Sequence, residues 1–119
     1  FSANHPMQAA FADFMADPSE YLGLPAFYQH KRDFFLQAMA HTRFKPLHCS
    51  GTYFQLFEYG HISNEPDLAF CKRLTTEFGV AAIPVSSFFS DGKDEKVIRL
   101  CFAKTDDLLE RAGKALEKV

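Results

Sequence analysis

The chain of 119 residues lacks the features that mark several specialised classes of protein. No apolar run approaches the roughly 20 residues that span a bilayer, and the amino terminus lacks the basic-then-apolar order of a signal peptide. The 13 Lys and Arg residues are interspersed with 15 Asp and Glu residues, so the basic stripe that nucleic acid requires is missing. We therefore expect no membrane partner, no nucleic-acid partner and a cytoplasmic location.

Cysteine is scarce, and metal-binding and catalytic motifs are missing. Cys49, Cys71 and Cys101 are odd in number and far apart, which argues against a disulfide framework and predicts three buried thiols. His30 and His41 would lie roughly 16 Å apart along one helix, too far to share a metal. No glycine-rich phosphate loop, paired-carboxylate motif or nucleophile elbow appears, so we expect no metal site.

The length and the hydrophobic pattern fit one domain, residues 1–119. Periodicity predicts helices over 6–16, 24–42 and 66–78 and a last helix capped by Thr105, whose inward-facing residues are Leu108, Leu109, Ala112 and Leu116. Strands are predicted over 44–49, 52–59, 80–84 and 97–103, with Ser50-Gly51 as a tight antiparallel turn. Residues 80–84 are wholly apolar, which favours a central strand, and 85–89 reads as a loop. The predicted fold is a two-layer α/β sandwich with a small mixed or antiparallel sheet and helices mainly on one face.

Arg99 is the most informative residue present, because its neighbours in 97–103 are otherwise apolar and typical of an interior strand. A buried guanidinium without an anion is costly, and its planar donors fit a carboxylate two bonds at a time. The sequence pattern is compatible with two roles for Arg99. Arg99 either pairs with an internal carboxylate or binds an anionic ligand. The candidate internal partners are Asp67, Glu77 and Glu58.

Phenylalanine is abundant, at 14 positions, and most of these rings are expected to fill the core. Phe88 and Phe89 are exceptions because they follow each other in a predicted loop. At least one of them is expected to line a cleft, and an aromatic pocket near Phe54, Phe88 and Phe89 is the alternative to core packing. Cys101 is read as a small buried hydrophobe rather than a nucleophile.

Three segments in order resemble the C-terminal part of a class I/II, fold-type I pyridoxal-phosphate aminotransferase. They are Gly51 to Phe54, Glu77 to Phe88 and Val97 to Lys104. Residues 1–10 and 27–33 resemble the same branch, which contains methionine and kynurenine aminotransferases. The resemblance implies that the chain is the small, C-terminal domain of such an enzyme. Residues 1–23 would then lead out of a preceding large domain.

The resemblance also implies roles for individual residues. Arg99 matches the arginine that binds the α-carboxylate of the amino acid or 2-oxo acid. Gly51 and Tyr53 match a strand that borders the substrate pocket, and Phe88 belongs to a loop that closes over it. Ala3 and Asn4 match a segment that approaches the neighbouring subunit's active site in homodimeric relatives. The implied substrate is methionine, an aromatic amino acid or kynurenine.

One departure from the family pattern is decisive for activity. No lysine follows the Ser-x-Ser-Lys type of motif that carries the Schiff base, and the cofactor-binding large domain would precede Phe1. We therefore expect pyridoxal phosphate in the full-length parent, none bound to this chain, and no transamination by the chain alone. The absence of an initiator methionine fits a processed form or an excised piece.

Two other function classes remain open from the sequence. A stand-alone module could use the same arginine to bind an amino acid without catalysis, and calorimetric titration with amino acids would detect it. A protein-interaction module is the other alternative, because a separated lobe exposes apolar surface.

Overall fold

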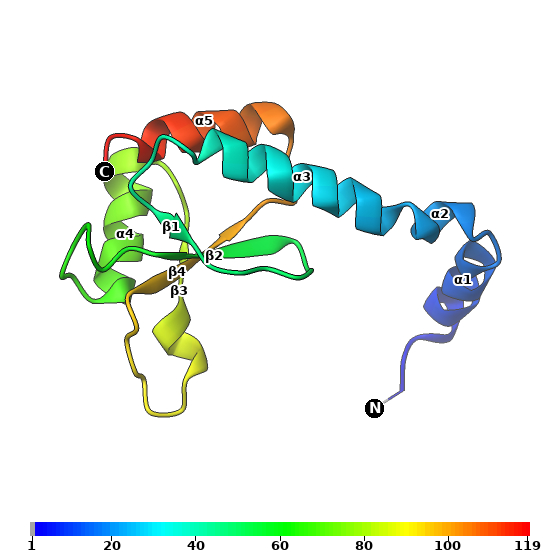
Figure 1. The fold of residues 1–119 in the computed structure, drawn as a ribbon. Helices are drawn as coiled ribbons and strands as arrows, with labels where there is room; N and C mark the ends of the chain where they lie inside the picture. The colour runs from blue at the N-terminus through cyan, green and yellow to red at the C-terminus, as the bar shows by residue number, and fades with distance from the viewer. Residues whose placement is uncertain (1) are drawn as a thin grey trace.

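A computed structural model describes residues 2–119. The described part contains five α-helices, one 3-10 helix and four strands (Figure 1). Their bounds are α1 His5–Met15, α2 Ser19–Leu22, α3 Leu24–Ala38, β1 Lys45–Pro46, β2 Phe54–Glu58, α4 Asp67–Phe78, β3 Ile83–Pro84, η1 Val85–Phe88, β4 Val97–Cys101 and α5 Asp106–Leu116. None of the helices in this part of the chain is long and apolar enough to cross a membrane.

The four strands form one antiparallel sheet in the order β1-β2-β4-β3. β4 therefore has a partner on each side, as expected for an interior strand. Leu56 of β2 and Ile83 of β3 both lie opposite Arg99. Because side chains alternate along a strand, this register fixes which residues share each face of the sheet.

The core lies on one face of the sheet, beneath α3, α4 and α5. Phe57 of β2 and Ile98 of β4 are completely buried there, against Phe35 of α3, Phe70 of α4 and Leu116 of α5. Figure 1 shows α3 and α5 running side by side over the sheet. The opposite face carries no helix layer, so the predicted two-layer sandwich with helices mainly on one face is confirmed.

The helices α3 and α5 approach closely at one glycine. Gly113 is buried, and a Cβ atom at this position would clash with the backbone carbonyl of Ala38 at the end of α3. The missing side chain lets the two helix backbones meet.

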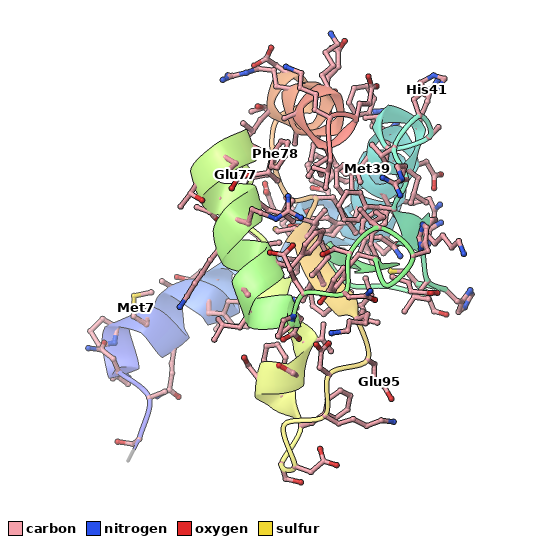
Figure 2. All side chains as sticks on the ribbon, turned by 90° about the vertical axis from the view of Figure 1, so that its left-hand side faces the viewer. Met7, Met39, His41, Glu77, Phe78 and Glu95 are labelled. Carbon is pink, nitrogen blue, oxygen red and sulfur yellow. The ribbon has the colours of Figure 1, made fainter. Side chains whose placement is uncertain are left out.

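The amino-terminal helices project away from this core (Figure 1). α1, predicted over 6–16, buries none of its residues, although its apolar residues follow helical spacing at Met7, Phe11, Phe14 and Met15. Figure 2 shows Met7 on the projecting helix, apart from the side chains packed around the sheet. The apolar side of α1 is therefore no part of the core within residues 2–119.

The strands are shorter than predicted. The β1–β2 hairpin is antiparallel, but its ladder pairs only Lys45 with Glu58 and Pro46 with Phe57. The predicted tight turn at Ser50-Gly51 is wrong, because residues 47–53 form a wider connection in which Thr52 adopts a positive φ of 67°. A ladder needs a partner for each residue, and hydrophobic pattern alone does not supply that information.

The predicted central strand over 80–84 is also wrong. Only Ile83 and Pro84 pair, at the edge of the sheet, and Ile83 is exposed. Proline lacks the N–H that a central strand must donate, which confines it to an edge. Residues 85–88 form the 3-10 helix η1 rather than the predicted loop.

Helix ends follow the local signals only in part. α4 ends at Gly79, whose left-handed φ of 69° is the expected glycine stop. α3 ends at Ala38 instead of Thr42, and the Thr42 hydroxyl bonds back to the Met39 carbonyl. Thr105 occupies the N-cap position of α5, but its side chain makes no capping hydrogen bond. Leu108, expected to face inward, is exposed.

Candidate functional site

Arg99 projects from the face of the sheet that lacks the helix layer. Its neighbours Ile98 and Leu100 point into the core, whereas Arg99 is half-buried on the other side. Leu56 and Ile83 lie opposite it on the two flanking strands and share its face. The aliphatic part of the Arg99 side chain therefore lies between two apolar residues, Leu56 and Ile83, on the same face of the sheet.

Two aromatic rings flank the Arg99 guanidinium. Its Cζ lies 4.7 Å from the centroid of the Phe54 ring and 5.1 Å from that of Phe88. Both separations are within the range at which a cation is attracted to an aromatic face. Phe54 comes from β2 and Phe88 from η1, so the site is assembled from three separate segments.

No carboxylate within residues 2–119 forms a salt bridge with Arg99. Of the three candidate partners, Asp67 instead accepts hydrogen bonds from Ser86, and Glu77 lies 3.9 Å from Arg73. Glu58 has no such bridge. The guanidinium is half-buried rather than deeply buried, so the strand tolerates it without an internal anion. Its N–H donors remain free to bind a ligand.

Gly51 and Tyr53 lie in the connection between β1 and β2. With the start of α3 this connection borders a groove of about 500 Å³, which also includes Tyr28 and Arg32. The Tyr53 ring is exposed and lies 5.8 Å, centroid to centroid, from the ring of Phe54. Tyr53 is thereby linked through Phe54 to Arg99, although Arg99 itself does not line this groove.

Phe88 and Phe89 are both exposed, at 63% and 41%, and only Phe88 contacts Arg99 among the described cation–aromatic pairs. Asn4 lies far from this cluster. Its side chain caps α1 by accepting a hydrogen bond from the Met7 N–H at 3.4 Å, at the projecting end of the molecule (Figure 1). The structure therefore brings Arg99 and Phe88 together, with Tyr53 nearby, and leaves Asn4 apart.

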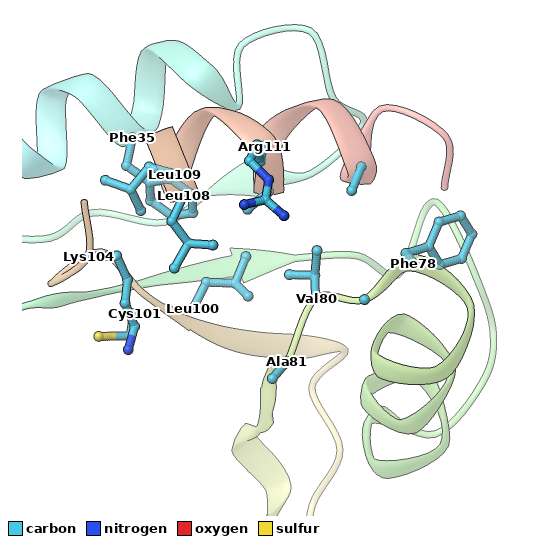
Figure 3. Close-up of a pocket in the computed structure, with 13 residues that line it drawn as sticks. Phe35, Phe78, Val80, Ala81, Leu100, Cys101, Lys104, Leu108, Leu109 and Arg111 are labelled. Atoms are coloured by element: carbon cyan, nitrogen blue, oxygen red, sulfur yellow. The ribbon is translucent and has the colours of Figure 1, made fainter. Parts of the chain in front are cut away.

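A second groove, which the sequence did not reveal, lies between α5 and the segment before β3. It measures about 460 Å³. Figure 3 shows Leu100, Val80 and Leu108 around it, with Arg111 reaching over it from α5. The groove opens on the helix side of β4 and does not include Arg99.

A cluster of polar residues connects η1, which carries Phe88, to the start of α4 and to the turn before β4. The Asp67 carboxylate accepts hydrogen bonds from the backbone N–H and the hydroxyl of Ser86, both at 2.7 Å. The Asp67 N–H donates to Asp94, which also pairs with the Lys96 amine at 2.7 Å. Burial raises the pKa of Asp94, but the hydrogen bonds from Lys96 and Asp67 outweigh it and lower that pKa overall. Nothing in the local sequence around Asp67 indicates its pairing with Ser86.

The prediction of three buried thiols is correct only for Cys71. Burial raises the pKa of the Cys71 thiol to about 12. Cys49 is half-buried, and Cys101 is exposed because it shares the uncovered face of β4 with Arg99. The helix layer covers only the other face of β4, which carries Ile98 and Leu100.

Comparison with known proteins identifies the family. Residues 1–116 match the family described as aminotransferase class I and II. The chain is 47% identical to methionine aminotransferase of Escherichia coli over its whole length, covering 31% of that protein. It is 34% identical to kynurenine–oxoglutarate transaminase 3 of Mus musculus over 90% of its length, covering 28% of that protein.

Solved structures agree with this assignment. An E. coli structure identified as a methionine aminotransferase superposes with a TM-score of 0.89 at 46% identity, over 99% of this chain and 32% of its own. N-succinyldiaminopimelate aminotransferase of Mycobacterium tuberculosis superposes with a TM-score of 0.84 at 28% identity, over 98% of this chain and 31% of its own. The chain belongs to the class I and II aminotransferases, a pyridoxal-phosphate-dependent family, and spans about a third of the length of these relatives.

The lysines of the described residues do not fit that cofactor. Pyridoxal phosphate needs a lysine amine for its aldehyde, in a site that shields the reacting atoms. Lys31 is paired with Asp106 at 2.7 Å and Lys96 with Asp94 at 2.7 Å. The six other lysines are exposed on the surface. None of the lysines within residues 2–119 is therefore both unpaired and shielded from water, as the amine that binds the cofactor's aldehyde needs to be.

Proposed function

We propose that Arg99 binds the substrate carboxylate in a pyridoxal-phosphate-dependent aminotransferase that moves an amino group between an amino acid and a 2-oxo acid. The observation that supports this role is the unpaired Arg99 guanidinium, held between Phe54 and Phe88 on the uncovered face of the sheet. Charge-assisted bidentate hydrogen bonds from such a group orient a carboxylate as well as bind it.

The surroundings of Arg99 favour an amino acid with a large apolar side chain. Leu56, Ile83 and the two rings present apolar surface around a single cation. A ligand with one carboxylate and an apolar body matches this surface better than a dicarboxylate does. Methionine, an aromatic amino acid or kynurenine fits that description, and the relatives named above carry methionine and kynurenine in their names.

The remaining parts of the active site belong to the proposed parent enzyme. In this proposal Gly51 and Tyr53 border the substrate pocket, and Phe88 closes over it. Asn4 reaches the active site of a partner subunit in a homodimer. A large domain supplies the Schiff-base lysine and holds the cofactor, so this chain alone does not transaminate.

Arg99→Ala in the full-length enzyme tests the proposal. The substitution should raise KM and lower kcat/KM by about 2 to 5 kcal/mol, the scale for removing one partner of a desolvated charge pair. Arg99→Lys should recover only part of the loss, because an ammonium cannot bind a carboxylate through a planar fork. Steady-state kinetics with an amino acid donor gives both values.

The matched control is Arg111→Ala. Arg111 is an exposed arginine on α5 whose closest carboxylate is Asp107 at 3.7 Å. Its removal should leave kcat/KM unchanged. Kinetics that do not respond to Arg99→Ala would reject the role of Arg99.

A further inference from the structure

Asp67 is a buried carboxylate whose position needs an explanation. It is only 2% exposed, at the first residue of α4, where a helix amino terminus favours negative charge. A carboxylate in that place commonly accepts from N–H groups of its own helix. Both Asp67 oxygens instead accept from Ser86, 19 residues later, one from the backbone N–H and one from the hydroxyl.

Ser86 belongs to η1, the turn that carries Phe88. The Phe88 ring is 63% exposed, so packing in the core does not hold it. Its position over Arg99 depends on the backbone of η1. Upstream, β3 ties the turn to β4 through the pairing of Pro84 with Ile98, and Asp67 ties the turn itself to α4.

Asp67 is itself bound by the turn that directly precedes β4, the strand that carries Arg99. Its N–H donates to the Asp94 carboxylate at 3.1 Å, and Asp94 accepts from both the backbone N–H and the amine of Lys96. Lys96 directly precedes β4. One continuous set of hydrogen bonds therefore connects the start of β4, the start of α4 and η1.

We propose that Asp67 is a positioning residue for substrate recognition, which holds Phe88 against the Arg99 guanidinium. With the ring fixed there, water is displaced from that side and the N–H donors stay directed at the ligand. Hydrogen bonds to a carboxylate strengthen when the donors are shielded in this way. This inference rests on the proposed function of Arg99.

Asp67→Asn in the full-length aminotransferase is the principal test. The amide turns an N–H toward one of the two Ser86 donors, so KM for the amino acid should rise by about tenfold while kcat changes less than about threefold. Ser86→Ala, a milder change that removes only the hydroxyl bond, should raise KM by about threefold. The matched control is Asp107→Asn, an exposed acid in the first turn of α5, which should leave KM unchanged.

A double-mutant cycle separates positioning from a general loss of stability. Phe88→Ala should raise KM by itself, and adding Asp67→Asn to that variant should raise it by less than about twofold. The reason is that Asp67 would have no ring left to position. Independent effects that multiply in full would overturn the inference.

Hydrogen exchange measures the contact without reference to activity. Asp67→Asn should speed exchange of the Ser86 amide by about tenfold or more and leave the β4 amides unchanged. This inference alone is overturned if Asp67→Asn leaves the exchange rate of the Ser86 amide unchanged. It is also overturned if Asp67→Asn leaves KM unchanged while Arg99→Lys impairs the enzyme. An Arg99→Lys enzyme with unchanged KM rejects the proposed function, and the role assigned to Asp67 falls with it.

Discussion

Arg99 shows how two environments meet in one side chain. Its stem lies in the row between Leu56 and Ile83, and its charged end lies between two rings. Cation–aromatic contacts of this kind hold a guanidinium in place without neutralising it. The charge therefore remains available to an incoming anion, which an internal salt bridge would have prevented.

The three thiols should differ sharply in reactivity. At about pH 8, an alkylating reagent should modify exposed Cys101 first and leave Cys71 unmodified, because the thiolate is the nucleophile and burial raises the pKa of Cys71 to about 12. Peptide mass spectrometry of the native protein gives the order of labelling.

Two controls accompany this measurement. In denaturant all three cysteines should react, and Cys101→Ser should remove the fastest labelling step. Labelling of Cys71 as fast as Cys101 in the native protein would contradict the burial described above.

The sequence predicted which residue carries the charge but not what surrounds it. Because side chains alternate along a strand, Arg99 lies on the face of β4 that is turned away from Ile98 and Leu100. The contacts with Phe54 and Phe88 depend on strand register and on η1, neither of which is encoded in local spacing. The partner of Asp67 was missed for the same reason, since Ser86 is distant in sequence and the bond exists only once β3 and α4 are packed.

At the scale of the elements, helices were predicted better than strands. Gly79 marks the end of α4, and proline begins or precedes several helices, so local signals give their bounds within a few residues. β1 and β3 contain two residues each, and their ends are set by their partners in the sheet. The stretch over 80–84 is wholly apolar, which is typical of a central strand. A segment at the edge of a sheet can have the same apolar pattern, so the pattern alone does not separate the two cases.

The contact between α3 and α5 gives a test at this scale. Gly113→Ala should lower the free energy of unfolding by about 1 to 3 kcal/mol, because the added methyl group meets the Ala38 carbonyl. In an unhindered helix the same change is stabilising, since alanine has the higher helix propensity. Urea or thermal unfolding measures the difference.

Gly23→Ala is the matched control. Gly23 has φ −76° and nothing within 4 Å of its added Cβ, so this change should be neutral or stabilise by up to about 1 kcal/mol. Equal effects of the two substitutions would show that the α3–α5 contact does not require a glycine.

The whole molecule is elongated. Its radius of gyration is 17.3 Å and its principal extents are 49 × 34 × 25 Å. A compact chain of this length would have a radius of about 13 to 14 Å. The projecting α1 accounts for this shape, and its apolar side chains, including Phe11 and Phe14, have no core to cover them. Sequence periodicity correctly predicted an amphipathic helix there but not that its apolar side stays uncovered.

This uncovered side predicts that the isolated chain associates as its concentration rises, because contiguous exposed apolar surface is removed from water on contact. Replacing both Phe11 and Phe14 with serine should weaken the association. Leu68→Ser is the control, since Leu68 is also about half exposed but lies on α4. Analytical ultracentrifugation over a concentration series measures the effect, and association that is unchanged by the double substitution would place the contact elsewhere.

The interior position of β4 has a further consequence for how such enzymes diversify. The strand is hydrogen-bonded along both edges, so Arg99, the proposed anchor for the acid group shared by all amino acids, is held within the framework of the sheet. The segments over 51–53 and 85–89 lie outside the ladder and can vary without disturbing it. Under the proposed role of Arg99, sequence changes in these two short connections would alter which amino-acid side chain is preferred, while recognition of the acid group would stay the same.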